Sequence, residues 1–216
     1  MKKFEAVVFD IDGTLTEEIS WTALTRDLGG SVEDHMAIFN ALREGRIDYL
    51  TSKLQLIDLW RATGNANKAF MEHLFANWPI RPEAPDLVRW LVEEGYTLGL
   101  ITGSLDLYAN SVAGQLGIEN YYANTELVFD TDGNLVDFHY ELDQAKKKLE
   151  QFQMFCGSKD IAAKDCVVVG DGDNDLELFR KTGHGVLVGD APSQDLIEVA
   201  WKRIDSLGEI KVLLSS

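Results

Sequence analysis

The stretch that decides the fold is FEAVVFDIDGT, residues 4–14. Its apolar, β-branched run is typical of a buried strand in a parallel sheet. The run ends in Asp10 and Asp12, whose side chains point the same way if the backbone stays extended. Two close carboxylates stay ionised only beside a cation or several donors, and ligands of open α/β sheets bind at carboxyl strand ends. The stretch therefore predicts a hard-metal site with a reactive carboxylate.

Two later apolar runs also end in polar clusters. Residues 96–101 precede Thr102-Gly103-Ser104, and residues 166–169 precede GDGDND, residues 170–175. Strands that alternate with helical patterns predict an α/β fold with a doubly wound parallel sheet, Rossmann-like in its connections. We also expect a strand at 186–188, a hairpin with its turn at 131–134, and helices at 86–94, 105–116, 143–155, 176–181, 194–200 and 208–214.

Residues 16–78 lack strand signals and show helical spacing instead. Capping residues and Gly breaks predict helices at 20–28, 31–44, 48–62 and 68–77. We therefore expect a core domain of residues 1–15 and 79–216, with a small all-α cap domain, residues 16–78, inserted after the first strand.

Composition narrows the class of partner. The 216 residues carry 20 Lys and Arg against 36 Asp and Glu, a net charge of −16, which argues against a nucleic-acid partner. No apolar run reaches the roughly 18 residues of a membrane span, and acidic residues interrupt the N-terminal run, unlike a signal peptide. Cys156 and Cys166 have no metal-ligand spacing. We expect a cytoplasmic protein with reduced thiols, and the sequence does not indicate an oligomeric state.

Each polar cluster has an ordinary structural explanation as well. The acidic pair after the first strand could cap a turn, the Thr-Gly-Ser loop could cap a helix, and the lysine run at 146–148 could be a solvated helix face. The acidic runs begin like a calcium loop, but they lack the Gly and Glu that an EF-hand needs at its sixth and twelfth positions. The convergence of three strand ends on one sheet edge favours a functional site.

The combined residue types predict phosphoryl transfer. A carboxylate nucleophile needs a cation to hold an anionic electrophile nearby, and a second acid can protonate the leaving oxygen. A hydroxyl, backbone N–H groups and a lysine can bind the phosphoryl oxygens, while remote carboxylates complete an oxygen-rich Mg²⁺ shell. The set of groups fits a reaction through an aspartyl phosphate.

These clusters resemble, in order, the four motifs of the haloacid dehalogenase superfamily, over essentially the whole chain. The resemblance implies that Asp10 is the nucleophile and that Asp12 is the general acid and then base. It also implies a Mg²⁺ site formed by Asp10, the backbone carbonyl of Asp12, Asp171 and Asp175. The expected cofactor is therefore Mg²⁺.

The same resemblance implies a phosphate site. Its residues would be Thr102, Gly103, Ser104, Lys146 and Asn174. Lys146 is the preferred motif lysine because Gln-Ala-Lys precedes the helix as in phosphatase relatives, with Lys147 or Lys148 as alternatives.

The helical block and the segment EGRIDY, residues 44–49, resemble the phosphoserine phosphatase branch. Members of that branch read the substrate amine with a Glu after the first motif, but Ile19 holds that place, beside Glu17 and Glu18. They read the substrate carboxylate with a cap Arg, where this chain has Leu54 next to Lys53. The resemblance thus implies a phosphatase of a small phosphorylated metabolite without implying serine specificity.

Two other functions stay open from the sequence. A phosphomutase on the same fold would pass the phosphoryl group to a second sugar hydroxyl instead of to water. The acidic balance and the helical block would also suit a non-enzymatic metal-binding or interaction protein. The leading prediction is a Mg²⁺-dependent phosphomonoesterase.

Overall fold

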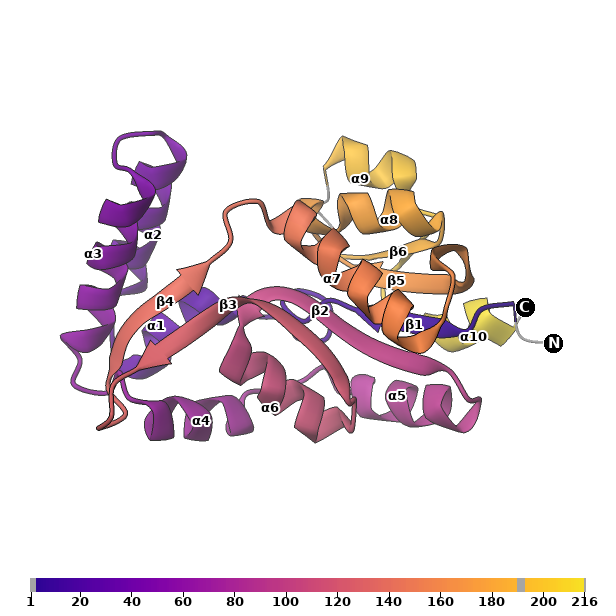
Figure 1. Cartoon of the computed structure of the whole chain (residues 1–216), viewed down its shortest axis with the longest axis horizontal. Helices are drawn as coiled ribbons and strands as arrows, with labels where there is room; N and C mark the ends of the chain where they lie inside the picture. The colour runs from indigo at the N-terminus through magenta and orange to yellow at the C-terminus, as the bar shows by residue number, and fades with distance from the viewer. Residues whose placement is uncertain (1–2, 190–192, 216) are drawn as a thin grey trace.

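In the computed structural model, the described residues, 3–189 and 193–215, form a seven-stranded sheet in the order β4-β3-β2-β1-β5-β6-β7 (Figure 1). The strands are β1 Ala6–Phe9, β2 Thr97–Leu105, β3 Asn120–Phe129, β4 Leu135–Tyr140, β5 Cys166–Gly170, β6 Gly185–Val188 and β7 Lys202–Ile204. Neighbouring strands are parallel except β3 and β4, which form an antiparallel pair. The predicted α/β fold is confirmed, and the hairpin makes the sheet mixed.

Strand β1 lies at the centre of the sheet. Phe9 at its end is in register with Leu100 of β2 and Val169 of β5, and the Asp10 N–H donates to the Val169 carbonyl at 2.9 Å. The carboxyl ends of these three strands therefore lie side by side. That register is what brings together the polar clusters that follow each strand.

Helices cover both faces of the sheet (Figure 1). One face carries α5 Ala84–Glu93 and α6 Asp106–Leu116, and the other carries α7 Gln144–Lys159, α8 Leu176–Thr182 and α9 Gln194–Val199; α10 Glu209–Ser215 packs on α5. Along β1, Val7 and Phe9 enter one apolar core while Ala6 and Val8 enter the other, as the two-residue period of a strand requires.

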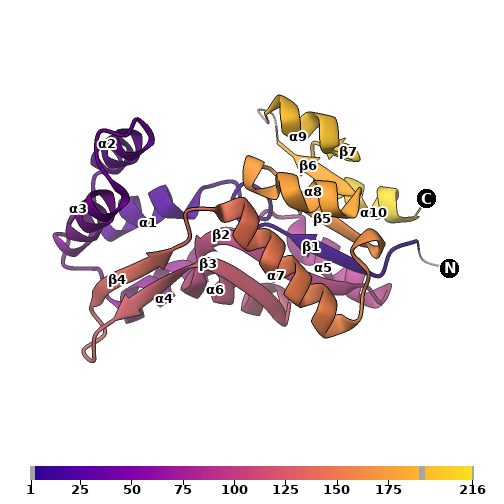
Figure 2. The same ribbon diagram turned by 45° about the horizontal axis from the view of Figure 1, so that its top comes forward.

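Residues 16–78, all of them described, contain four helices and no strand: α1 Ser20–Leu28, α2 Val32–Arg43, α3 Tyr49–Arg61 and α4 Lys68–Asn77. Helices α2, α3 and α4 begin at side-chain N-caps, Ser31, Asp48 and Asn67, each accepting a hydrogen bond from a backbone N–H three residues on. Figure 2 shows α2 and α3 at one end of the molecule, with α1 running back toward the core. The helical character predicted for the block is present, and its division from the core as a cap domain remains a proposal.

The β3–β4 hairpin contacts the helical block, which the sequence did not indicate. The Lys68 N–H donates to the Gly133 carbonyl at 2.8 Å, and the Leu135 N–H donates to the Ala66 carbonyl at 2.9 Å. Helix α4 also packs on α6. The hairpin and α4 thus tie the helical block to the sheet.

Some strand limits differ from the prediction. Strand β2 continues to Leu105 instead of ending at residue 101, because Thr102 and Leu105 pair with Ala123 and Thr125 of β3. The first half of β3 and the three-residue β7 were not predicted, since short or Asn-bearing segments carry weak strand signals. Across residues 3–189 and 193–215, no helix combines the length and apolar character needed to cross a bilayer.

Candidate active site

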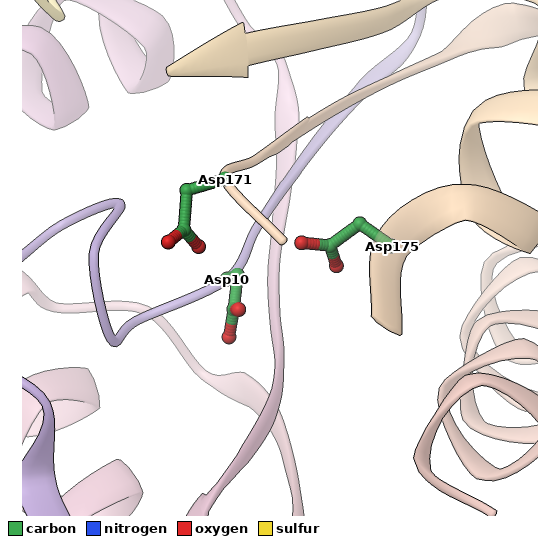
Figure 3. Close-up of side chains that lie close together, drawn as sticks. All are labelled: Asp10, Asp171 and Asp175. Atoms are coloured by element: carbon green, nitrogen blue, oxygen red, sulfur yellow. The ribbon is translucent and has the colours of Figure 1, made fainter. Parts of the chain in front are cut away.

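Three carboxylates meet where β1 and β5 end. Asp10 follows β1, Asp171 follows β5, and Asp175 comes from the short 3₁₀ turn before α8. One ligand oxygen from each lies within 4.8 Å of the others, and Figure 3 shows the side chains around a common space. Asp10 and Asp175 are buried and Asp171 is partly buried. The strand ends predicted to converge do lie together.

Close carboxylates with little access to water resist ionisation. Burial, with the charge of Asp10, raises the pKa of Asp171 to about 6. Burial also raises the pKa of Asp175 to about 7, although a nearby lysine opposes it. Among the described atoms, the buried Asp175 Oδ2 has no hydrogen-bond partner. An all-oxygen donor set with an unpaired buried oxygen fits a hard divalent cation such as Mg²⁺.

Lys148 joins two of these carboxylates. Its Nζ lies 2.8 Å from Asp10 Oδ2 and 2.7 Å from Asp175 Oδ1, and its side chain is fully buried. Burial alone would lower the pKa of this lysine, but the charges of Asp10 and Asp175 outweigh burial and raise it. Lys148 is therefore a permanent cation within the site.

The preference for Lys146 as the site lysine is corrected by this geometry. Helix α7 begins after Asp143, whose carboxylate accepts from the Lys146 N–H, and the Lys146 side chain faces solvent in this first turn. Lys148 instead shares the buried stripe of α7 with Phe152 and Phe155, four and seven residues on. That helical spacing was the signal in the sequence that identifies Lys148.

Asp12 is held by a serine that the sequence did not single out. The hydroxyl of Ser20, at the start of α1, donates to Asp12 Oδ2 at 2.6 Å and also contacts the Ser104 hydroxyl. Burial raises the pKa of Asp12 to about 7, with a further contribution from Asp10, while the Ser20 hydrogen bond lowers it. The carboxyl of Asp12 can therefore exchange a proton near neutral pH.

Apart from Lys146, the residues expected at the phosphate lie in β2 and in the turn that carries Asp175. Thr102 is buried in β2, and its hydroxyl accepts from the Ser104 N–H at 3.2 Å. A Cβ on Gly103 would lie 2.7 Å from Gln144 Oε1 and 3.4 Å from Asn174 Nδ2, so Gly103 allows these side chains to approach the backbone. The Oδ1 atom of Asn174 is buried without a partner among the described atoms. The set from β2 and the turn before α8 is thus brought together.

The loop after β1 packs against Asp171 and forms a hydrogen bond with it. Gly13 has φ +75°, and a Cβ there would lie 2.1 Å from Asp171 Oδ2, while the Thr14 hydroxyl donates to Asp171 Oδ1 at 3.3 Å. Arg81, between α4 and α5, donates to the carbonyls of Thr14 and Gly13 at 2.9 and 3.2 Å. Glu17 lies 3.4 Å from Arg81. Sequence reasoning missed Arg81, because nothing local indicates the loop that it contacts.

Comparison with known proteins identifies the family. The haloacid dehalogenase-like hydrolases match residues 4–183. This chain belongs to that family. The phosphoserine phosphatase of Methanocaldococcus jannaschii is 27% identical over 187 residues, which cover 84% of each chain. That of Albidiferax ferrireducens is 28% identical over 192 residues, 86% of this chain and 79% of the relative.

Solved structures agree in fold. A structure described as a phospho-aspartyl intermediate analogue of phosphoserine phosphatase has a TM-score of 0.77 at 24% identity, covering 99% of this chain and 100% of the other. A hydrolase of the same family from Salmonella enterica serovar Typhi has a TM-score of 0.80 at 20% identity, covering 98% of this chain and 72% of the other.

In this haloacid dehalogenase-like hydrolase, the charged residues noted beside the substrate-reading positions are paired within the protein. Glu18 is exposed and lies 2.9 Å from Arg26. Lys53 Nζ lies 2.6 Å from Asp137, and Leu54 is 52% exposed.

Proposed function

We propose that this hydrolase is a Mg²⁺-dependent phosphomonoesterase that forms an aspartyl phosphate on Asp10. The observation that carries the proposal is the cluster of Asp10 with Asp171 and Asp175, in which the Lys148 ammonium lies 2.8 Å from Asp10. The family match supports hydrolysis, and relatives named phosphoserine phosphatase support phosphate monoesters as the substrate class. The solved phospho-aspartyl analogue of a phosphoserine phosphatase supports the covalent intermediate.

The reaction has two steps. A carboxylate oxygen of Asp10 attacks phosphorus, the bond from phosphorus to the alcohol oxygen breaks, and Asp12 gives its proton to that oxygen. Asp12, now ionised, takes a proton from water, whose oxygen attacks phosphorus and releases Asp10 and inorganic phosphate. The pKa of about 7 for Asp12 supports both directions of proton transfer.

Binding groups surround the phosphoryl position. We assign the phosphoryl oxygens to the Thr102 hydroxyl, the backbone N–H groups of Gly103 and Ser104, the Lys148 ammonium and the Asn174 amide. Asp10, the Asp12 carbonyl, Asp171 and Asp175 would hold Mg²⁺. When bound, the ion offsets the repulsion between the attacking carboxylate and the phosphate oxygens.

The substrate we propose is a small phosphorylated metabolite in the cytoplasm. The net charge of −16 makes a nucleic-acid partner unfavourable, and we propose no membrane partner. Serine specificity is not part of the proposal. We place the cap domain at residues 16–78 and the core at residues 1–15 and 79–216, with residues 1, 2, 190–192 and 216 outside the described part of the chain.

The test compares turnover of a generic aryl phosphate by the wild type and by Asp10→Asn, each with Mg²⁺ and with EDTA. The nucleophile and the metal are each indispensable, so either change should reduce turnover by orders of magnitude. Asp132→Asn, an exposed carboxylate in the hairpin turn, is the control and should retain full activity. Equal turnover by the wild type and Asp10→Asn, with Mg²⁺ and with EDTA, would refute the proposal.

The two other functions give different results. A phosphomutase would isomerise a sugar phosphate with little free phosphate. A metal-binding protein would take up Mg²⁺ without phosphate release over a panel of amino-acid, sugar and nucleotide monophosphates.

A further inference from the structure

An apolar cavity of about 340 Å³ lies between α1, α2, α3 and strand β4. Side chains from all four elements line it, mainly aliphatic and aromatic groups: Ile19, Trp21, Phe39, Leu42, Leu56 and Phe138. Aromatic rings pack on one another in its wall, with Trp21 and Phe138 centroids 5.5 Å apart in an edge-to-face arrangement. Figures 1 and 2 both show α3 beside β4, at the end of the molecule away from the termini.

Two lining residues of the cavity are linked to residues of the proposed active site. On one wall, Ile19 directly precedes Ser20, whose hydroxyl donates to Asp12. On the other, the Tyr140 side chain shares a hydrogen bond with the side chain of Gln144, which lies against Gly103. These two links connect the cavity wall to groups beside Asp12 and Gly103.

The cavity offers no unpaired charge among its described lining residues. Lys53 is the cation there, and its Nζ lies 2.6 Å from Asp137 and donates to the Phe138 carbonyl at 3.1 Å. His35 shares a hydrogen bond with Thr25, and burial lowers its pKa, which keeps the ring neutral at pH 7. An ammonium or a carboxylate entering this space would lose its hydration without gaining a counter-charge.

We propose that this cavity binds an uncharged, apolar group of the substrate alcohol, so that the preferred substrates are monophosphate esters of apolar alcohols. The inference rests on the proposed phosphatase function and specifies its substrate class. A cavity of about 150 Å³ lined by aliphatic and aromatic side chains accepts a benzene ring. The larger space here has room for a ring or for an alkyl chain of several carbons.

A series of linear alkyl phosphates, from methyl to hexyl phosphate, tests the cavity. Every member carries the same phosphate group, and only the length of the alkyl chain changes. Each methylene that enters an apolar site should raise kcat/KM by about fourfold until the space is filled. Phosphoserine should be hydrolysed with a kcat/KM no higher than that of methyl phosphate. If the enzyme is active but kcat/KM does not rise with the length of the alkyl chain, the inference is wrong. A clear preference for phosphoserine would also overturn it.

A matched pair of variants tests whether the rise of kcat/KM with chain length comes from this cavity. Phe39 lines the cavity and is 49% exposed, whereas Leu54 is 52% exposed on the neighbouring helix α3 and does not line it. Phe39→Ala should reduce the kcat/KM gain from methyl to hexyl phosphate at least threefold. Leu54→Ala should keep the full gain. Equal loss in both variants would contradict the assignment of the cavity.

Binding of methylphosphonate and hexylphosphonate, measured by calorimetry with Mg²⁺, separates this inference from the proposed function because neither compound is hydrolysed. Hexylphosphonate should bind at least tenfold more tightly. If it does not, the cavity inference is wrong whether or not the esters react. If it does, but no ester in the series releases phosphate, the proposed phosphatase function is wrong and the apolar binding site stands.

Discussion

Replacing Lys148 with Met isolates the electrostatic role of the buried lysine. Methionine keeps much of the length of the side chain but removes the charge. Asp10 and Asp175, 4% and 1% exposed, would then face each other without the ammonium that lies within 2.8 Å of both. Removing one partner of a buried ion pair typically costs about 3–5 kcal/mol of unfolding free energy.

That cost should appear as a large fall in the melting temperature. In a domain of this size, 1 kcal/mol corresponds to about 2–4 °C, so Lys148→Met should melt roughly 6–20 °C below the wild type. Protonation of Asp175, whose pKa burial raises to about 7, relieves the repulsion. The difference from wild type should therefore be largest near pH 8 and smaller at pH 5.

Thermal unfolding followed by circular dichroism, with EDTA present so that no divalent ion replaces the lost charge, measures the effect. Lys146→Met is the matched control, because this side chain is exposed in the same helix two residues earlier. We expect its unfolding free energy to stay within about 0.5 kcal/mol of the wild type. Equal destabilisation by the two variants, or a Lys148→Met defect that grows toward pH 5, would refute the reasoning.

Three further predictions concern proton and metal binding. Ser20→Ala removes a hydrogen bond that lowers the pKa of Asp12, so the alkaline limb of the kcat/KM profile should move to higher pH; a downward shift would contradict this. Gly13→Ala places a Cβ 2.1 Å from Asp171 Oδ2 and should weaken Mg²⁺ binding in calorimetry at least tenfold. Gly64→Ala, at a similar φ of +76° with no atom within 4 Å, should show only the backbone strain and retain Mg²⁺ affinity. The three aspartates with raised pKa favour the folded state when protonated, so their contribution to stability is lost as pH rises through about 6–7. The melting temperature in EDTA should therefore fall between pH 5 and pH 8, and Mg²⁺ should raise it more at pH 8; a rise in EDTA over that interval would be the contrary result.

Strands of the sheet could be predicted where a run of apolar residues in the sequence corresponds to a strand buried on both faces. The β1 run alternates Val7 and Phe9 with Ala6 and Val8 between two cores, and such fully apolar strands are visible without any partner. The extension of β2 through residues 102–105 was not visible, because its polar residues are stabilised by pairing with β3. Local propensity carries no information about a strand partner that lies some twenty residues away.

The residues of the candidate site also fall into those that the sequence pattern indicated and those that it did not. Asp10 and Asp171 were found because parallel topology forces neighbouring strand ends together. Lys148 was named only as an alternative to Lys146, because the residues before the helix outweighed its periodicity, although the spacing to Phe152 was available. Ser20 reaches Asp12 only through the fold of the helical block, so nothing in the local sequence indicates this contact.

Charge balance relates the buried lysine to the cluster of three carboxylates around it. The ionised forms of Asp10, Asp171 and Asp175 carry three negative charges, and Lys148 offsets one of them within 2.8 Å. The remaining two match the charge of a single divalent cation. A phosphate dianion would otherwise enter a strongly negative site in a protein whose net charge is already −16. Lys148 alone leaves two of these charges without a counter-charge, which is the electrostatic argument for the proposed divalent cation, with the unpaired oxygen of Asp175 as a candidate ligand.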